Sequence, residues 1–323
     1  MHPTMKISVV IPCYNADLWI IGTLESVIAQ TILPHEVFVI DDGSSDRTLT
    51  SVQTFAATSP VPVIVLQSDR LGPAGARNVG IQAATGDWIA FLDADDWWKP
   101  EHLERICAAV QTSGDVVYLA SAEHFSINVN RVVSRSDSPF DTLQTNIDHS
   151  TYFALYQKHG LLELSSSAIS RQRLTEVGGF KPEFRGAEDF EMIMRAVYDR
   201  TLAYDPTPSS YYRCNNPESH SHKFALDEGG LTAHFRALQS LQESYDISSD
   251  ILAGIAKTVA SKSINLEESS ARQKVLQLVW PYLSKSQKFV FTAASYFPAL
   301  YLLLNDLRHK IRGPQYGPRQ VVQ

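Results

Sequence analysis

The chain has 323 residues, of which 44% are hydrophobic and 20% charged, so it can form one large globular domain with an extension and is too apolar for disorder throughout. Its formal net charge of −7 argues against nucleic acid as a partner, because binding a phosphate backbone requires a basic surface. Its three cysteines lie far apart, which argues against a zinc knuckle or a disulfide framework and fits a reducing, cytoplasmic compartment.

The first 120 residues alternate between short runs rich in Val and Ile and helical patterns, as successive strand–helix units do. We predict an α/β fold with a mostly parallel, Rossmann-like sheet flanked by helices. The expected strands cover residues 7–11, 37–40, 63–66, 88–92 and 116–119. The expected helices cover residues 18–30, 47–57, 74–84 and 101–112.

Polar residues follow the expected strands. The ends of parallel strands point their loops into one crevice, which is where a ligand binds in such sheets. Three of these loops read Pro12-Cys13-Tyr14-Asn15, Asp41-Asp42-Gly43-Ser44 and Asp93-Ala94-Asp95-Asp96. The sequence therefore predicts a binding site at this edge of the sheet.

The loop after the fourth strand carries three carboxylates, on Asp93, Asp95 and Asp96. They would repel one another without a cation, and oxygen-only ligation favours Mg²⁺ or Mn²⁺, which bind through one or two carboxylates together with substrate phosphates. An acidic loop that caps the helix beginning near residue 100 accounts for them equally well. Taken alone, the loop indicates a metal site but does not decide it.

Two further features suit a nucleotide. The Asp41-Asp42 pair at a strand end is left unexplained by helix capping, whereas a contact with a base or ribose explains it. Arg77 lies on a helix opened by Gly72-Pro73-Ala74-Gly75 and could present its guanidinium to a diphosphate; a plain surface arginine is the alternative.

The rest of the chain divides into three stretches. Residues 121–163 are polar with weak periodicity, which predicts loops and short elements rather than a continued sheet. A strand at 165–170, a helix at 172–177 stopped by Gly178-Gly179 and a helix at 190–198 follow. From about Phe224 the pattern is helical. We therefore predict an α/β domain over 1–223 and a helical C-terminal extension over 224–323.

Five motifs occur in the same order as in glycosyltransferase family 2. They are Val9-Val10-Ile11-Pro12-Cys13-Tyr14-Asn15, Asp41-Asp42-Gly43-Ser44-Ser45-Asp46, Gly75-Ala76-Arg77-Asn78, Gly86-Asp87 and Leu92-Asp93-Ala94-Asp95-Asp96. The sequence resembles this family over roughly residues 5 to 215. The resemblance implies the GT-A fold, a nucleotide-sugar donor, Mn²⁺ or Mg²⁺ as cofactor and inversion at the anomeric carbon. It also implies that 1–223 is the catalytic domain, with a nucleotide-binding half (1–120) and an acceptor-binding half (121–223).

The resemblance also implies roles for individual residues on the donor side. The nucleotide-sugar contacts are Pro12, Tyr14 and Asn15 along the nucleotide, Asp42 at the base (commonly uracil), Asp93 near the ribose and Arg77 facing the phosphates. Asp95 would hold the metal that bridges the diphosphate. His220, in Ser219-His220-Ser221-His222, occupies the place of a late metal or phosphate contact in some relatives, and a surface loop is the alternative.

The acceptor side has its own motif. Val177-Gly178-Gly179-Phe180 followed by Gly186-Ala187-Glu188-Asp189-Phe190-Glu191 resembles the family segment that carries the catalytic base. Asp189 is the expected base. Glu188 is the alternative, because sequence does not separate two adjacent carboxylates at a helix start, and simple helix capping is a third interpretation.

Two departures from the processive synthases of the family affect the expected reaction. The Gln/Arg-x-x-Arg-Trp motif and the multiple membrane spans of those enzymes are missing, so we expect transfer of one sugar at a time to an acceptor hydroxyl of a saccharide, in polysaccharide or glycoconjugate biosynthesis. A sugar-phosphate nucleotidyltransferase is the rival enzyme, but the first loop has no glycine to cradle phosphate. A non-catalytic nucleotide-sugar-binding protein is the rival from another class, yet all the expected acids are present.

The C-terminal extension contains a basic segment. Between residues 285 and 319 it has six Lys or Arg residues and one acidic residue, around an apolar run that is too short and too polar to cross a bilayer. This pattern predicts a helix on an anionic membrane surface, at the inner face of the membrane, where the acceptor could be a lipid-linked saccharide. Packing on the catalytic domain or on a second subunit of a homo-oligomer explains it equally well.

Overall fold

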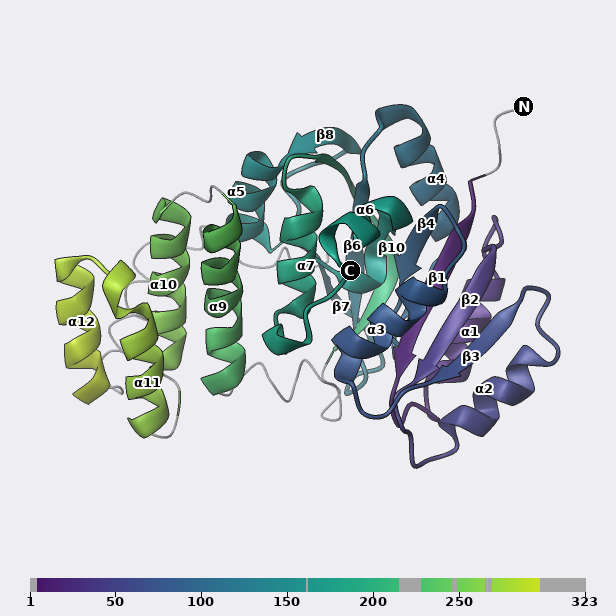
Figure 1. Cartoon of the computed structure of the whole chain (residues 1–323), viewed down its shortest axis with the longest axis horizontal. Coiled ribbons are helices and arrows are strands. Elements are labelled where there is room, and N and C mark those ends of the chain that lie inside the picture. The colour runs from purple at the N-terminus through teal and green to yellow at the C-terminus, as the bar shows by residue number, and fades with distance from the viewer. Residues whose placement is uncertain are drawn as a thin grey trace. The chain divides into compact units, whose positions relative to one another are not determined.

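The computed structural model describes residues 5–160, 162–214, 228–245, 249–264, 266 and 269–296 (Figure 1). Contacts divide the chain into two compact units. The first unit runs to Glu183 and again from Glu188 through the last strand, β10 (Thr201–Cys214), and the second contains Phe184–Ala187 and the helices after β10. The domain boundary predicted at residue 223 falls between β10 and α9 (Glu228–Ser244), outside the described residues.

The first unit is built on one ten-stranded sheet with the order β3-β2-β1-β4-β9-β6-β10-β5, to which β7 adds at β6 and β8 at β10. Strands β1 to β4 pair in parallel, as do β6 and β10, and β9 runs antiparallel between β4 and β6. The strands before β10 are β1 (Ile7–Cys13), β2 (Glu36–Asp41), β3 (Val63–Gln67), β4 (Trp88–Phe91), β5 (Trp97–Trp98), β6 (Val117–Ser126), β7 (Arg131–Arg135), β8 (Gln144–Asp148) and β9 (Ser167–Ser170). The predicted α/β fold with a mostly parallel sheet is confirmed.

Strand β1 shows why the core sequence is apolar without alternation. Its side chains are buried on both faces of the sheet, and only Pro12 is partly exposed. Val9 belongs to the cluster that packs under α1, whereas Val10 faces Gly80 of α3 on the other side. A central parallel strand covered on both faces needs a continuous Val and Ile run, which is how the sequence predicted it.

The four helices expected in the first 120 residues are confirmed to within a few residues. The helices of the first unit are α1 (Ile20–Ile28), α2 (Thr48–Ala56), α3 (Gly72–Ala83), α4 (His102–Ser113), α5 (His149–His159), α6 (Arg171–Val177) and α7 (Glu188–Val197), with 3₁₀ turns at Leu164–Ser166 and Pro182–Phe184. Helix α6 begins where the Ser170 hydroxyl accepts a hydrogen bond from the Arg173 amide at 3.2 Å. It ends at Gly178, whose φ of 78° suits glycine.

The expectation for residues 121–163 was wrong. Strand β6 continues to Ser126, β7 and β8 join the same sheet, and α5 follows. Most side chains of β7 are exposed, so this strand has no apolar alternation to reveal it. Strand β10 was not among the expected strands, because Pro206 and Pro208 interrupt its pattern; its pairing with β6 shifts register between Asp205 and Ser210.

The second unit is helical in its described part, as the sequence predicted. It contains α9, α10 (Ser249–Ser263), α11 (Ser269–Val279) and α12 (Lys285–Tyr296), with a 3₁₀ turn at Trp280–Tyr282 (Figure 1). Its core includes Phe235, which meets the Tyr282 ring edge-on with centroids 5.1 Å apart. Within the described ranges, none of the helices has the length and apolar character that crossing a bilayer requires.

Gly80 of α3 allows the helix to contact the sheet closely. A Cβ atom at this position would lie 2.6 Å from a methyl group of Val10 and 2.8 Å from one of Ile40. Gly80→Ala should therefore lower the free energy of unfolding by about 1–3 kcal/mol, measured by urea denaturation. The matched control is Gly22→Ala on α1, where the glycine is exposed with nothing within 4 Å, and it should raise stability by about 0.5–1 kcal/mol. Equal effects of the two changes would contradict this packing.

Candidate active site

The loops that follow β1 and β2 are tied together by Asn15. Its backbone amide donates to the Ser44 hydroxyl at 2.9 Å, and its side-chain oxygen accepts from the Ser45 backbone amide at 2.8 Å. Asn15 has a positive φ of 50°, which asparagine adopts more readily than most residues. The predicted nucleotide contacts Pro12 and Asn15 thus lie on one braced edge of the sheet.

Tyr14 is the exposed member of this edge. Its side chain is 49% exposed, and the Arg70 guanidinium lies 5.6 Å from the centre of its ring. An exposed aromatic ring beside a cation offers a flat surface and a positive charge to a ligand. The predicted role of Tyr14 along the nucleotide remains a prediction.

Asp42 is buried and engaged within the protein. Its carboxylate accepts hydrogen bonds from the Ser68 hydroxyl at 2.6 Å and from the amides of Leu71 and Gly72 at 2.8 Å each. A carboxylate at the start of α3 is favoured by the helix dipole, so capping explains this residue in part. Its contact with a base stays a prediction, and such a contact would share an oxygen that already accepts a hydrogen bond.

Arg77 brings the two acidic motifs together. The residue is buried, its Nη2 lies 2.6 Å from an oxygen of Asp93, and its Nη1 lies 3.6 Å from an oxygen of Glu188. The ring of Phe180 lies 5.4 Å from the guanidinium. Burial acts to lower the pKa of Arg77, but the nearby carboxylates outweigh it and raise the pKa, so the residue is a permanent cation at the junction of the motifs.

The three acids in the loop after β4 differ in how far they are buried. Asp96 points inward, where its carboxylate accepts from the Ser165 hydroxyl at 2.6 Å and from the Arg213 amide at 2.8 Å. Burial, together with the charges of Asp95 and Asp93, raises the pKa of Asp96 well above its ordinary value. Asp93 and Asp95 are partly exposed, so they are the two acids of this loop that a ligand can reach.

Arg213, at the end of β10, holds the backbone of this loop. Its Nε donates to the Asp95 carbonyl at 2.7 Å, and its guanidinium lies between the rings of Trp19 and Trp97, at 4.1 and 4.8 Å from their centres. Arg213 was not among the predicted site residues. In the sequence it is a single arginine after two tyrosines, in a strand that the hydrophobic pattern did not predict.

The acids of this loop fit a hard divalent cation. Among the residues that the structure describes, no three His, Cys, Asp or Glu side chains converge on a single point. Mg²⁺ and Mn²⁺ do not require such a cage, because they bind through one or two carboxylates, waters and the phosphates of a substrate. Asp93 and Asp95 match that donor set. The other predicted metal contact besides Asp95, His220, lies outside the described residues.

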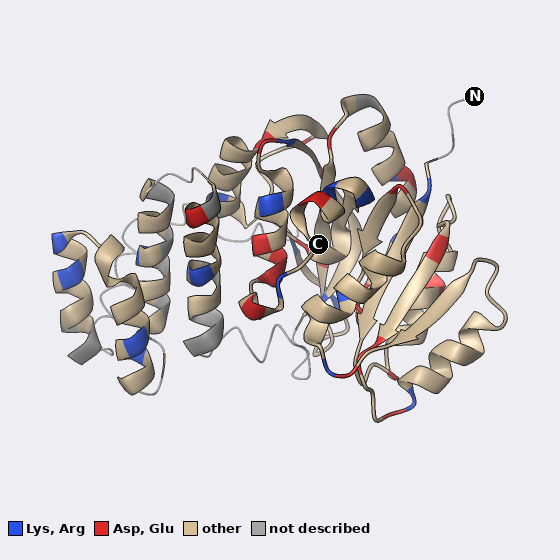
Figure 2. Cartoon of the chain, in the orientation of Figure 1, with Lys and Arg blue, Asp and Glu red and all other residues tan. Residues whose placement is uncertain are grey.

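Glu188 and Asp189 form the first turn of α7, which Figure 2 marks in red. Glu188 is buried and paired with Arg77. Asp189 is partly exposed and accepts a hydrogen bond from the Phe190 amide at 2.7 Å. Burial and the neighbouring charge of Glu188 raise the pKa of Asp189 to about 6. The two adjacent acids therefore differ: one holds an arginine, and the other has a pKa suited to exchanging a proton near neutral pH.

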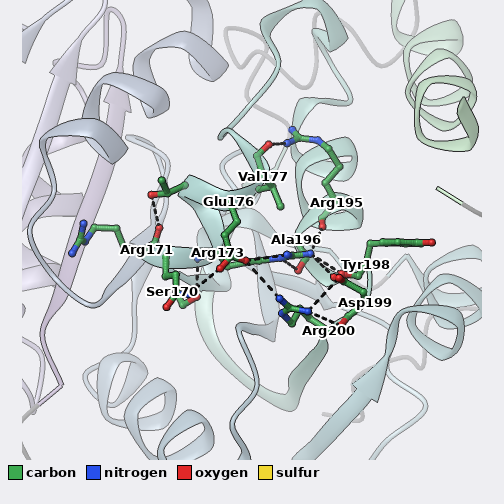
Figure 3. Close-up of polar contacts among 12 residues, drawn as sticks. Ser170, Arg171, Arg173, Glu176, Val177, Arg195, Ala196, Tyr198, Asp199 and Arg200 are labelled. Atoms are coloured by element: carbon green, nitrogen blue, oxygen red, sulfur yellow. Dashed lines mark hydrogen bonds and ion pairs between the residues drawn. The ribbon is translucent and has the colours of Figure 1, made fainter. Parts of the chain in front are cut away.

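Two arginines fix the helix that carries this acid pair (Figure 3). Arg173 of α6 donates to the carbonyls of Arg195 at 2.9 Å, Ala196 at 2.8 Å and Tyr198 at 2.6 Å, at the C-terminal end of α7. Arg195 of α7 donates in return to the Val177 carbonyl at the end of α6. Carbonyls at helix ends lack partners within their own helix, so each arginine caps the other helix.

A family model described as Glycosyl transferase family 2 matches residues 8–176, more than half of the 323 residues. The chain belongs to glycosyltransferase family 2. Membership agrees with the resemblance seen in the motifs. The matched segment contains the loops after β1, β2 and β4, where the nucleotide-sugar contacts are predicted.

Relatives and solved structures agree with this assignment. Uncharacterized glycosyltransferase alr2836 of Nostoc sp. is 42% identical over 113 residues, 35% of either chain. Amylovoran biosynthesis glycosyltransferase AmsB of Erwinia amylovora is 30% identical over 198 residues, 59% of this chain and 64% of the relative. The match thus spans only part of each relative. The structure of S. aureus TarS 1-349 in complex with UDP-GlcNAc superposes with a TM-score of 0.56 at 22% identity, covering 88% of this chain and 75% of that one. This likeness establishes the GT-A fold.

Proposed function

We propose that this family 2 protein is a metal-dependent, inverting and non-processive glycosyltransferase, which moves a sugar from a UDP-sugar to an acceptor hydroxyl in polysaccharide or glycoconjugate biosynthesis. The observation that carries the proposal is the position of Arg77 between Asp93 of the donor loop and Glu188 of the acid pair. The amylovoran relative supports a polysaccharide product. The complex of TarS with UDP-GlcNAc supports a uridine donor.

On the donor side, Asp95 would hold Mn²⁺ or Mg²⁺. Asp93 would lie near the ribose of the donor. The ion would supply positive charge to the diphosphate as it leaves. Arg77 adds a second cation. Its buried Nε makes no hydrogen bond within the described part of the chain, and its Nη1 lies 3.6 Å from Glu188, beyond hydrogen-bond distance, which supports a contact with phosphate.

On the acceptor side, Asp189 takes the proton of the acceptor hydroxyl. The oxygen then forms a bond to the anomeric carbon from the face opposite the diphosphate, and the bond from that carbon to the diphosphate breaks with inversion. A base with a pKa of about 6 is deprotonated at neutral pH and still accepts a proton in the transition state. Glu188 pairs with Arg77 and orients that residue.

Loss of the base should reduce turnover. Asp189→Asn should lower kcat for UDP release by about 10²-fold and leave the KM for the donor nearly unchanged. In the wild type, kcat/KM should fall about tenfold per pH unit below pH 6, because Asp189 acts only when deprotonated. Steady-state UDP release across pH measures both effects.

Glu188→Gln is the matched change. It removes the charge of one of the two carboxylates that pair with Arg77, so it should raise the KM for the donor more than it lowers kcat. The reverse pattern, with turnover lost in Glu188→Gln and kept in Asp189→Asn, would assign the base to Glu188.

The metal should bind through Asp95. Asp95→Asn should weaken the binding of UDP in the presence of Mn²⁺ by about 10–100-fold, measured by isothermal titration calorimetry. Glu25→Gln on α1, an exposed acid outside the site, should bind UDP as the wild type does. Equal UDP affinity of the wild type in Mn²⁺ and in chelator would refute metal dependence.

We also propose that α12 contacts an anionic membrane surface, where a lipid-linked saccharide acceptor would be found. Phe289 is 77% exposed and Val290 is exposed beside it, and the same helix carries Lys285 and Lys288. Exposed aromatic and basic side chains on one helix suit the interface of an anionic bilayer. The other basic residues of the 285–319 segment lie outside the described residues.

The full chain should therefore float with vesicles that contain phosphatidylglycerol, and less so at high salt, because screening weakens the lysine contribution. Phe289→Ser should reduce flotation. Leu18→Ser, which removes a leucine that is 82% exposed in the first unit, should not. A chain that stays in the soluble fraction but elutes as a dimer would assign α12 to a subunit contact instead.

A further inference from the structure

Asn78, which follows Arg77 on α3, joins this helix to a loop 102 residues away. Its Nδ2 donates to the Phe180 carbonyl at 2.8 Å, and its Oδ1 accepts from the Phe180 amide at 2.8 Å. The side-chain amide thus satisfies both backbone groups of one residue, as a neighbouring strand would. The position of Phe180 is fixed relative to α3 by two hydrogen bonds.

Gly179 permits this close approach. Its φ is +67°, and a Cβ atom there would lie 2.5 Å from the Oδ1 of Asn78. A side chain at this position would be strained and would also push Asn78 away. The glycine and the asparagine therefore fit each other as a pair.

Helix α7 holds the same loop from the other side. The Nη2 of Arg195 donates to the Gly179 carbonyl at 2.7 Å. The guanidinium is kept in place by both carboxylate oxygens of Glu191, at 2.8 and 2.6 Å, and Lys181 pairs with Glu191 at 3.0 Å. The dipeptide 179–180 is thus bonded to α3 through Asn78 and to α7 through Arg195.

The ring of Phe180 adds a third connection. It lies 5.4 Å from the Arg77 guanidinium and meets the ring of Phe91 on β4 edge-on, also at 5.4 Å. Movement of the dipeptide would therefore disturb both Arg77 and the helix that carries Asp189.

We propose that Asn78 is a positioning residue, which keeps the base-bearing helix α7 in register with Arg77 through the dipeptide 179–180. The proposal rests on the proposed function, since it assigns Arg77 to the donor and Asp189 to the acceptor. Asn78 itself takes no part in the chemistry. Its effect is geometric: an acceptor oxygen and an anomeric carbon react only when closely aligned, and a shift of about 1 Å can reduce the rate by 10²-fold.

The test compares Asn78→Ala with Gln82→Ala, which removes an exposed side-chain amide from the same helix. The assay is UDP release from UDP-glucose, UDP-galactose and UDP-GlcNAc with Mn²⁺, alongside calorimetry with UDP. Asn78→Ala should lower kcat by about 10–100-fold while UDP affinity stays near that of the wild type. Gln82→Ala should change neither quantity. Asn78→Asp should not restore kcat, because it places a carboxylate oxygen against the Phe180 carbonyl.

Hydrogen exchange gives a readout that does not need turnover. In Asn78→Ala, amides 188–197 of α7 should exchange faster than in Gln82→Ala, whereas amides 36–41 of β2 should exchange as in the wild type. Faster exchange throughout the chain, or α7 exchange and kcat equal to those of Gln82→Ala, would overturn the positioning role. A wild type that releases no UDP from any of these sugars would refute the proposed function, and the exchange result would still decide whether Asn78 couples α3 to α7.

Discussion

The site depends on the burial of one cation, the guanidinium of Arg77. A charge removed from water is stable only beside opposite charge, and here Asp93 lies at 2.6 Å and Glu188 at 3.6 Å. One partner follows β4, a central strand of the sheet, and the other begins α7. Because the loss of either carboxylate would weaken the compensation of the buried guanidinium, the two ion pairs favour a fixed distance between the two motifs. The donor and acceptor sides of the proposed reaction are held by this electrostatic requirement.

The acids of the site occur in adjacent pairs, and in each pair one acid is bonded within the protein while the other is more accessible. In the loop after β4, Asp96 turns inward to Ser165 and Arg213, while Asp95 stays within reach of a ligand. At the start of α7, Glu188 is bound to Arg77, while Asp189 has a pKa raised to about 6. At the start of α7 the structural acid acts on its neighbour, since the adjacent charge of Glu188 helps to raise the pKa of Asp189. In the loop after β4 the direction is reversed, because the charges of Asp95 and Asp93 help to raise the pKa of the buried Asp96.

Local features were predictable from the sequence, and long-range partners were not. Short apolar runs identified β1 to β4, and Gly178 marked the end of α6, because each of these signals lies within or next to the element that it predicts. The family resemblance added residue roles. No local pattern pairs Arg77 with Glu188, or Asn78 with a loop 102 residues away. The resemblance made Asp189 the expected base and Glu188 the alternative, but the residues themselves did not separate the two acids, whose surroundings differ only in three dimensions.

Arginine, rather than lysine, recurs wherever the site is assembled from the ends of elements. A helix end leaves backbone carbonyls without partners, and a guanidinium offers several N–H groups in fixed directions, whereas an ammonium offers a compact point charge. Arg173 and Arg195 use that geometry to cap each other's helices, and Arg213 holds a carbonyl of the loop after β4. Each of these contacts gives a backbone carbonyl a charged hydrogen-bond donor. The same hydrogen bonds therefore stabilise the fold and place the proposed catalytic acids.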